Sequence, residues 1–97
     1  MLAPTFVWNP LKYAENQRKH GVSFEEASDA FRDEHGLLLY DPDHSGAEDR
    51  YLLLGLSARL RLLVVCHCYR ESETVIRIIS ARKATTNEAL QYERGGS

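Results

Sequence analysis

The sequence is poor in the features that define several classes of protein. Its only cysteines, Cys66 and Cys68, lie two apart in a strand-like run where disulfide geometry is poor, so we expect two buried thiols and no disulfide-stapled domain. No apolar stretch reaches the roughly 18 residues that span a bilayer, and the N-terminus has no signal-peptide pattern. The sequence therefore predicts a cytoplasmic protein with no membrane contact, and its 97 residues predict one domain over 1–97.

Motifs for metal and nucleotide chemistry are also lacking. The four histidines show no metal-ligand spacing, and the chain has neither a glycine-rich phosphate loop nor a serine elbow. Residues 41–49 partly follow the spacing of a calcium loop, but Leu52 stands where that loop needs a bidentate carboxylate. We therefore expect no metal and no cofactor.

What the sequence does contain is a regular alternation of helix and strand patterns. The pairs Asn9–Pro10, Ser23 with Glu26, and Thr85 with Glu88 are helix-start signals. The predicted elements are a strand at 5–8, helices at 10–20 and 24–33, strands at 37–40, 51–55, 60–69 and 74–81, and a last helix from 85. Hairpin-length connections make the last three strands antiparallel. We predict an α+β fold, in which two N-terminal helices pack on one face of a small antiparallel sheet and a C-terminal helix follows.

The strand at 60–69 predicts which sheet face is covered. Alternation with period two gives one wholly apolar face with Leu62, Val64, Cys66 and Cys68. The other face is mixed and carries Arg61, Leu63, Val65, His67 and Tyr69. Arg77 of the next strand is expected beside His67. The helices should then cover the apolar face, which leaves the mixed face for chemistry.

Basic side chains concentrate in the second half, where residues 51–97 carry a net charge of +3 against -5 for residues 1–50. The cations and imidazoles available to an anion are Lys19, His20, Arg61, His67, Arg77, Arg82 and Lys83. Cleavage of RNA without a metal needs proton-transfer groups and cations at phosphorus, which His with Arg or Lys can supply. The same pattern also fits solvated strand ends and a histidine satisfied within the sheet, so spacing alone leaves both interpretations open.

Two long segments are distinctive: residues 19–27, Lys-His-Gly-Val-Ser-Phe-Glu-Glu-Ala, and residues 77–85, which end in Ile-Ser-Ala-Arg-Lys-Ala-Thr. Shorter pieces accompany them at residues 6–10 with Lys12 and Asn16, 41–45, 48–50, 62–65 with His67, and at Glu88, Tyr92 and Glu93. Together these pieces span nearly the whole chain. In this order they resemble the BrnT family of bacterial toxins from type II toxin–antitoxin modules.

This resemblance implies a RelE-like ribonuclease toxin that cuts RNA without a metal and inhibits translation. It also implies a hetero-oligomer with a BrnA-like ribbon-helix-helix antitoxin. In that complex only the antitoxin would contact operator DNA. We predict His67 and Arg82 as catalytic residues. The predicted RNA or phosphate contacts are Lys19, His20, Arg61, Arg77 and Lys83. The alternative is an inactive homologue that serves only as a binding partner in antitoxin-mediated operon repression.

Overall fold

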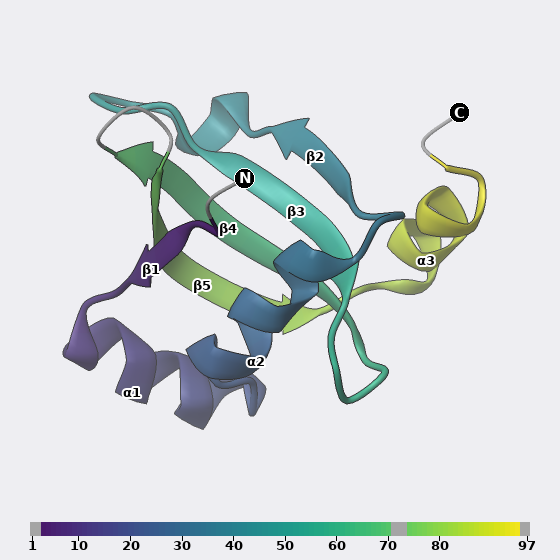
Figure 1. Ribbon diagram of the computed structural model, residues 1–97, viewed down its shortest axis with the longest axis horizontal. Helices are drawn as coiled ribbons and strands as arrows, with labels where there is room; N and C mark the ends of the chain where they lie inside the picture. The colour runs from purple at the N-terminus through teal and green to yellow at the C-terminus, as the bar shows by residue number, and fades with distance from the viewer. Residues whose placement is uncertain (1–2, 71–73, 96–97) are drawn as a thin grey trace.

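A computed structural model describes residues 3–70 and 74–95 of the chain. Its elements are β1 (Thr5–Val7), α1 (Pro10–His20), α2 (Phe24–Asp29), the 3-10 turn η1 (Ala30–Arg32), β2 (Leu37–Tyr40), the 3-10 turn η2 (Pro42–His44), β3 (Tyr51–Leu56), β4 (Leu62–Arg70), β5 (Val75–Lys83) and α3 (Thr86–Glu93). Figure 1 shows α1 and α2 near one side of the sheet and α3 at its far end. None of these helices is long and apolar enough to cross a membrane.

The five strands form one sheet in the order β1-β5-β4-β3-β2. Strands β2, β3, β4 and β5 are paired in antiparallel fashion, each with the next. The short connections predicted this orientation for β3, β4 and β5. The short strand β1 instead pairs in parallel with β5, with Thr5 opposite Val75. The sheet is therefore mixed, and the prediction of a purely antiparallel sheet was wrong. A three-residue strand far from its partner in sequence carries no signal for its direction.

Local capping chemistry sets the helix ends at the predicted places. The Asn9 side chain accepts hydrogen bonds from two backbone N–H groups at the start of α1, and Gly21 ends that helix in the left-handed conformation with φ of 65°. Thr85 and Glu88 form the predicted reciprocal capping box of α3. Ser23 accepts from the Glu26 N–H at 3.0 Å, but the Glu26 carboxylate points elsewhere, so this box is only half formed.

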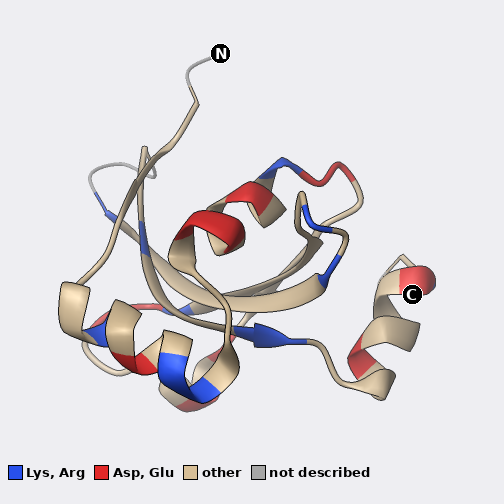
Figure 2. Ribbon diagram, turned by 90° about the horizontal axis from the view of Figure 1, so that it is seen from below, with Lys and Arg blue, Asp and Glu red and all other residues tan. Residues whose placement is uncertain are grey.

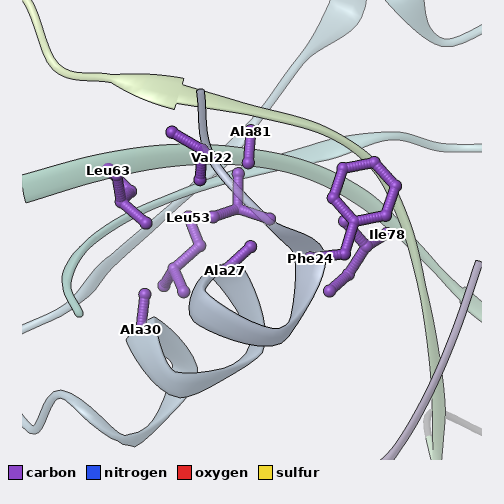
Figure 3. Close-up of a cluster of buried hydrophobic side chains, with 9 residues drawn as sticks. Val22, Phe24, Ala27, Ala30, Leu53, Leu63, Ile78 and Ala81 are labelled. Carbon is purple, nitrogen blue, oxygen red and sulfur yellow. The ribbon is translucent and has the colours of Figure 1, made fainter. Parts of the chain in front are cut away.

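The helices cover the sheet face opposite to the one predicted. Near α2, the side chains of Val22, Phe24, Ala27 and Ala30 enter the core. They meet Leu53, Leu63, Val65, Ile78 and Ala81 of the sheet (Figure 3). The expectation that the Cys66 face lies under the helices was therefore wrong. Both faces of β4 are apolar along most of their length, so alternation alone could not decide between them.

A bulge in β5 explains where its basic residues lie. Cys66 pairs with Ser80 and His67 with Ile78, so Ile79 has no partner on β4. This shift puts Ile78 and Ala81 on the helix-covered face together. Arg77, opposite Cys68, then lies on the other face of the sheet, contrary to the prediction that it accompanies His67. We call this other face, which also carries Val64, Cys66, Ser80 and Arg82, the open face.

A buried asparagine binds the backbone of β5 where the strand extends beyond the end of β1. Strand β1 pairs with β5 only as far as Arg77. Beyond it, Asn16 of α1 donates to the Ala81 carbonyl at 2.9 Å and accepts from the Ala81 N–H at 3.0 Å. Its amide also donates to the Val22 carbonyl at 2.9 Å. Because Asn16 is only 4% exposed, these bonds fix the Ser80–Arg82 segment against α1.

Candidate functional site

A hollow of about 390 Å³ opens on the open face of the sheet, where η2 approaches β5. Its apolar floor consists of Leu52, Val64, Cys66 and Ile79. Its polar rim includes Asp41, His44, Arg50, Ser80 and Arg82. We call it the open-face hollow. An apolar floor with a few convergent polar groups is the usual form of a ligand site.

Arg82 is held at this rim by a carboxylate from α3. Its two terminal nitrogens bind the two oxygens of Glu88 at 2.7 and 2.9 Å, and Nη1 also donates to the Lys83 carbonyl at 3.3 Å. The hydrogen bonds from Arg82 are the main cause that lowers the pKa of Glu88 to about 2, and Glu88 in turn raises the pKa of Arg82. Since Glu88 is itself fixed by the capping box, the guanidinium has a defined direction. With 39% of the side chain exposed, it remains open to an anion.

A histidine outside the predicted set of site residues lies on the same rim. His44 Nδ1 is 2.8 Å from Asp41 Oδ2, and a carboxylate can only accept, so Nδ1 carries the hydrogen. Asp41 is 8% exposed, whereas the His44 side chain is 68% exposed. Within the described parts of the chain, no hydrogen bond occupies His44 Nε2. A carboxylate that orients one ring nitrogen leaves the other one free for proton transfer.

The loop from Asp41 to Arg50 holds this pair in place. The Asp41 N–H donates to the Arg50 carbonyl at 2.9 Å. The Ser45 hydroxyl donates to the Asp41 carbonyl at 2.7 Å and accepts from the Arg50 N–H at 2.9 Å. A clue in the sequence was that Asp41 and His44 stand three apart directly after a strand, within one of the segments that match the family. In the sequence this stretch fits a solvated turn, which gives no sign that the two side chains pair.

A second hollow, of about 160 Å³, adjoins the first at the β5 bulge. Its lining residues are Lys12, Glu15, Asn16, Lys19 and His20 of α1 with Ile79 and Ser80 of β5. Because Ile79 and Ser80 line both hollows, α1 and η2 both approach the same short segment of β5. Figure 2 shows basic residues on α1 and at the end of β5, which runs between α1 and α3. The predicted Lys19 and His20 thus lie beside the open-face hollow, and Lys12 is an addition to the predicted set.

Arg77 and Lys83 lie at opposite ends of β5. Arg77 is ion-paired with Glu48, and its Nε is buried with no hydrogen-bond partner in the described residues. Lys83 is exposed at the end of the strand. The exposed Lys19 pairs with Glu15 at 3.1 Å, an ion pair that solvent weakens. Lys19 is therefore freer to meet a phosphate than Arg77.

Arg61 lies on the helix-covered side and forms a structural ion pair. Its Nε donates to Glu26 at 2.8 Å, and its Nη2 donates to the other Glu26 oxygen and to the Gly21 carbonyl. The Ser57 hydroxyl donates to the same carboxylate at 2.7 Å. These bonds, led by those from Arg61, lower the pKa of the buried Glu26. The predicted phosphate contact is occupied by a carboxylate of α2.

His67, predicted as catalytic, lies in the protein interior. It is 0% exposed, and its ring packs edge-on against Phe31 at a centroid distance of 4.8 Å. Its Nδ1 lies 3.0 Å from the Val65 carbonyl, so this nitrogen donates, and Nε2 lies 3.4 Å from the Tyr69 hydroxyl. The structure does not bring His67 to Arg82. It places His67 on the far side of the sheet from the open-face hollow.

Burial makes the stability of the fold sensitive to the protonation of His67. Desolvation lowers the pKa of the folded imidazole below the ordinary value near 6.5. As pH falls through about 6.5, His67 becomes protonated in the unfolded chain but stays neutral in the folded chain. The free energy of unfolding should therefore fall, with a limiting slope of about 1.4 kcal/mol per pH unit. Urea unfolding between pH 7.5 and 5 measures this loss.

The matched variants are His67→Phe, which keeps a ring in the core, and His20→Gln on the surface. We expect His67→Phe to flatten the decline above pH 5 and His20→Gln to leave it unchanged. An unchanged decline in His67→Phe would assign the effect to other groups.

No group of three or more His, Cys, Asp or Glu side chains that could hold a metal ion is found over residues 3–70 and 74–95.

Comparisons with known proteins place the chain in a family. The family model described as "Ribonuclease toxin, BrnT, of type II toxin-antitoxin system" matches residues 8–88. A search of curated proteins found no match. Among solved structures, the ribonuclease toxin BrnT of Brucella abortus matches with a TM-score of 0.62 and 22% sequence identity, over 87% of this chain and 100% of that chain. The structural likeness confirms the fold, and the family match over most of the chain confirms the resemblance seen in the sequence. The chain belongs to the BrnT family of ribonuclease toxins of type II toxin–antitoxin systems.

Proposed function

We propose that this chain is an endoribonuclease that cuts RNA in the open-face hollow without a metal ion and thereby inhibits translation. The observation that carries the proposal is the rim of that hollow, where His44 oriented by Asp41 and Arg82 oriented by Glu88 line one solvent-open space. Proton transfer and charge stabilisation are the two functions that metal-free cleavage requires.

The proposed reaction transfers the phosphoryl group from the 5′-oxygen of one nucleotide to the 2′-oxygen of the preceding ribose. The ribose 2′-oxygen attacks phosphorus, its proton passes to a protein base, and the bond to the 5′-oxygen breaks as that oxygen receives a proton. His44 Nε2 performs one of these proton transfers, and His20 beside the shared Ile79–Ser80 segment performs the other. Arg82 binds the phosphate oxygens whose charge increases during attack. The products are a 2′,3′-cyclic phosphate and a 5′-hydroxyl.

In this proposal the predicted site residues divide into two groups. Arg82, Lys19, His20 and Lys83 face the RNA, together with Lys12. His67 and Arg61 stabilise the fold, since His67 donates to the Val65 carbonyl and Arg61 binds the Glu26 carboxylate. Arg77 remains beside Glu48 and positions the loop before β3.

The partner follows from the family, because a type II toxin implies an antitoxin. We propose that it is a BrnA-like ribbon-helix-helix protein that forms a hetero-oligomer with this chain in the cytoplasm and holds it on operator DNA. A chain with a net charge of -2 lacks the concentrated basic stripe of an autonomous DNA-binding domain. We further propose that the fold is RelE-like, with the sheet and its two N-terminal helices as the shared part.

A second candidate function is an inactive homologue that acts only as a partner in repression. One observation favours it: all three predicted arginines, Arg61, Arg77 and Arg82, are paired with a carboxylate. RNA would have to compete with Glu88 for Arg82 before cleavage.

Cleavage of a labelled RNA by the purified chain in excess EDTA tests the proposal. We expect cleavage to persist and to leave 5′-hydroxyl and 2′,3′-cyclic phosphate ends. Arg82→Ala, purified in the same way, should be about 100-fold slower, because the transition-state charge loses its cation. Equal rates for the two proteins would reveal a contaminating nuclease. Cleavage that returned only with added divalent cation would overturn the metal-free reaction, and a folded chain with no cleavage would favour the inactive homologue.

A further inference from the structure

The strand β2 forms an edge of the sheet. It is the last strand in the order, and among residues 3–70 and 74–95 it pairs only with β3. Its four residues, Leu-Leu-Leu-Tyr, contain no charge and no proline, the two features that most often block an edge strand. Such an edge invites another strand unless something covers it.

The hydrogen-bond pattern shows which backbone groups of β2 are unused. The Asp41 N–H, directly after β2, donates to the Arg50 carbonyl, so the backbone at position 41 points toward the β3 side, although the Arg50 N–H donates to Ser45 instead. Backbone directions alternate along a strand, so Leu39 and Leu37, opposite Leu52 and Leu54, point toward β3, and the N–H and C=O groups of Leu38 and Tyr40 point outward. In the described chain no hydrogen bond occupies these outward groups.

The side chains of the same two residues are also uncovered. Leu38 is 52% exposed and Tyr40 is 53% exposed. Tyr40 begins a row of rings across the sheet, with Tyr51 at a centroid distance of 5.6 Å and then Tyr69 at 5.3 Å from Tyr51. Tyrosine is enriched where protein interfaces are energetically important. Backbone groups and apolar side chains therefore present one continuous docking edge.

Acidic residues flank this edge at both ends and indicate what can bind it. Glu34 is exposed before β2, while Asp43 and Asp49 are exposed after it. Asp49 also accepts from the Tyr40 hydroxyl at 3.1 Å. A second copy pairing in antiparallel fashion would bring Glu34 of one chain toward the acidic end of the other. Like charges would then oppose self-association, whereas basic residues at both ends of a partner strand would be attracted.

We propose that the antitoxin docks on β2 by adding an extended segment as a sixth strand of the sheet, with apolar residues at alternate positions and a basic residue near each end. The inference rests on the proposed antitoxin partner. Main-chain bonds to Leu38 and Tyr40 would supply affinity, and the alternate side chains would supply specificity. Because β2 leads directly into Asp41 and His44, a segment that continues past Tyr40 would also reach the open-face hollow.

The variant Leu38→Pro tests the proposal most directly. Proline removes an N–H that faces outward, so the ladder to β3 is kept, and edge positions tolerate proline. We expect the dissociation constant for the purified cognate antitoxin to rise at least about 100-fold. Leu38→Ala, which keeps the N–H, should raise it less than about 10-fold. RNA cleavage by Leu38→Pro in the absence of antitoxin should match that of the wild type.

Hydrogen exchange on the wild-type complex decides the matter even if Leu38→Pro does not fold. We expect antitoxin to slow exchange of the Leu38 and Tyr40 amides, and Glu34→Lys to weaken binding at low salt. Unprotected amides with a tight complex would overturn the proposal. The proposal would also be overturned if the chain alone formed a dimer that Leu38→Pro abolishes, because a second copy of the chain would then occupy β2. These measurements use binding, so a chain without nuclease activity would leave them interpretable.

Discussion

Replacing His44 by glutamine is expected to slow RNA cleavage about 100- to 1,000-fold, the usual contribution of a positioned proton-transfer group. Glutamine keeps a hydrogen-bonding side chain near Asp41 but cannot exchange a proton near neutral pH. His44 is 68% exposed on a turn, so the fold should be unaffected. Single-turnover cleavage of a labelled RNA in EDTA, with unfolding followed in parallel, measures both quantities.

The matched control for His44 is the other candidate histidine. His67→Phe keeps a ring against Phe31, so we expect the folded fraction of this variant to cleave at nearly the wild-type rate. Asp41→Asn should act through His44 by favouring the wrong tautomer, which would change the pH profile of cleavage as well as its rate. If His44→Gln were fully active and His67→Phe were folded but inactive, the catalytic histidine would be His67 and not His44.

Local signals in the sequence were sufficient to place nearly every element. Asn9, Gly21 and the Thr85–Glu88 box act within one helical turn, so their effect is readable without the fold. The same holds for the short connections between β3, β4 and β5. Helix 24–33 was predicted as continuous, whereas the structure changes to a 3-10 turn at Ala30. There Gly55 allows close packing, since a Cβ on it would lie 2.8 Å from the Ala30 carbonyl oxygen.

The faces of the sheet could not be predicted because they depend on non-local packing. Leu63 and Val65 are as apolar as Leu62 and Val64, so alternation in β4 carries no preference. His67 made its face look polar, although its nitrogens are satisfied by the Val65 carbonyl and the Tyr69 hydroxyl. The unpaired Ile79 then shifted the register and moved Arg77 to the opposite face.

The candidate site was predicted in part for the same reason. Arg82, Lys19 and His20 were selected as cations, and the structure places all three along the two adjoining hollows. Whether an arginine is free or paired depends on carboxylates far away in sequence. Glu26, the partner of Arg61, is 35 residues from it, and no spacing rule connects them.

Replacing Arg61 by alanine is expected to cost about 3 kcal/mol of stability, because it leaves the Glu26 carboxylate buried without its main partner. The Glu26 side chain is 4% exposed and that of Arg61 is 26% exposed, so solvent can replace little of the lost interaction. For a domain of this size the melting temperature should fall by roughly 10–20 °C. Thermal and urea unfolding at pH 7 measure the loss.

Activity distinguishes this structural role from a phosphate contact. Below its melting temperature, Arg61→Ala should bind and cleave RNA at close to the wild-type rate, because its guanidinium faces Glu26 and Gly21 rather than the open-face hollow. Arg59→Ala is the matched control, because it removes the same charge from the same hairpin. Arg59 is 73% exposed and comes no nearer to Glu26 than 4.0 Å, so stability should change by less than about 0.5 kcal/mol.

Because Glu26 has a lowered pKa, the stability difference between wild type and Arg61→Ala should be full at neutral pH. It should shrink as pH falls below the ordinary glutamate value of about 4.5 and the carboxylate of the variant takes up a proton. A variant as stable as the wild type that no longer cleaves RNA would show instead that Arg61 leaves Glu26 to bind the substrate.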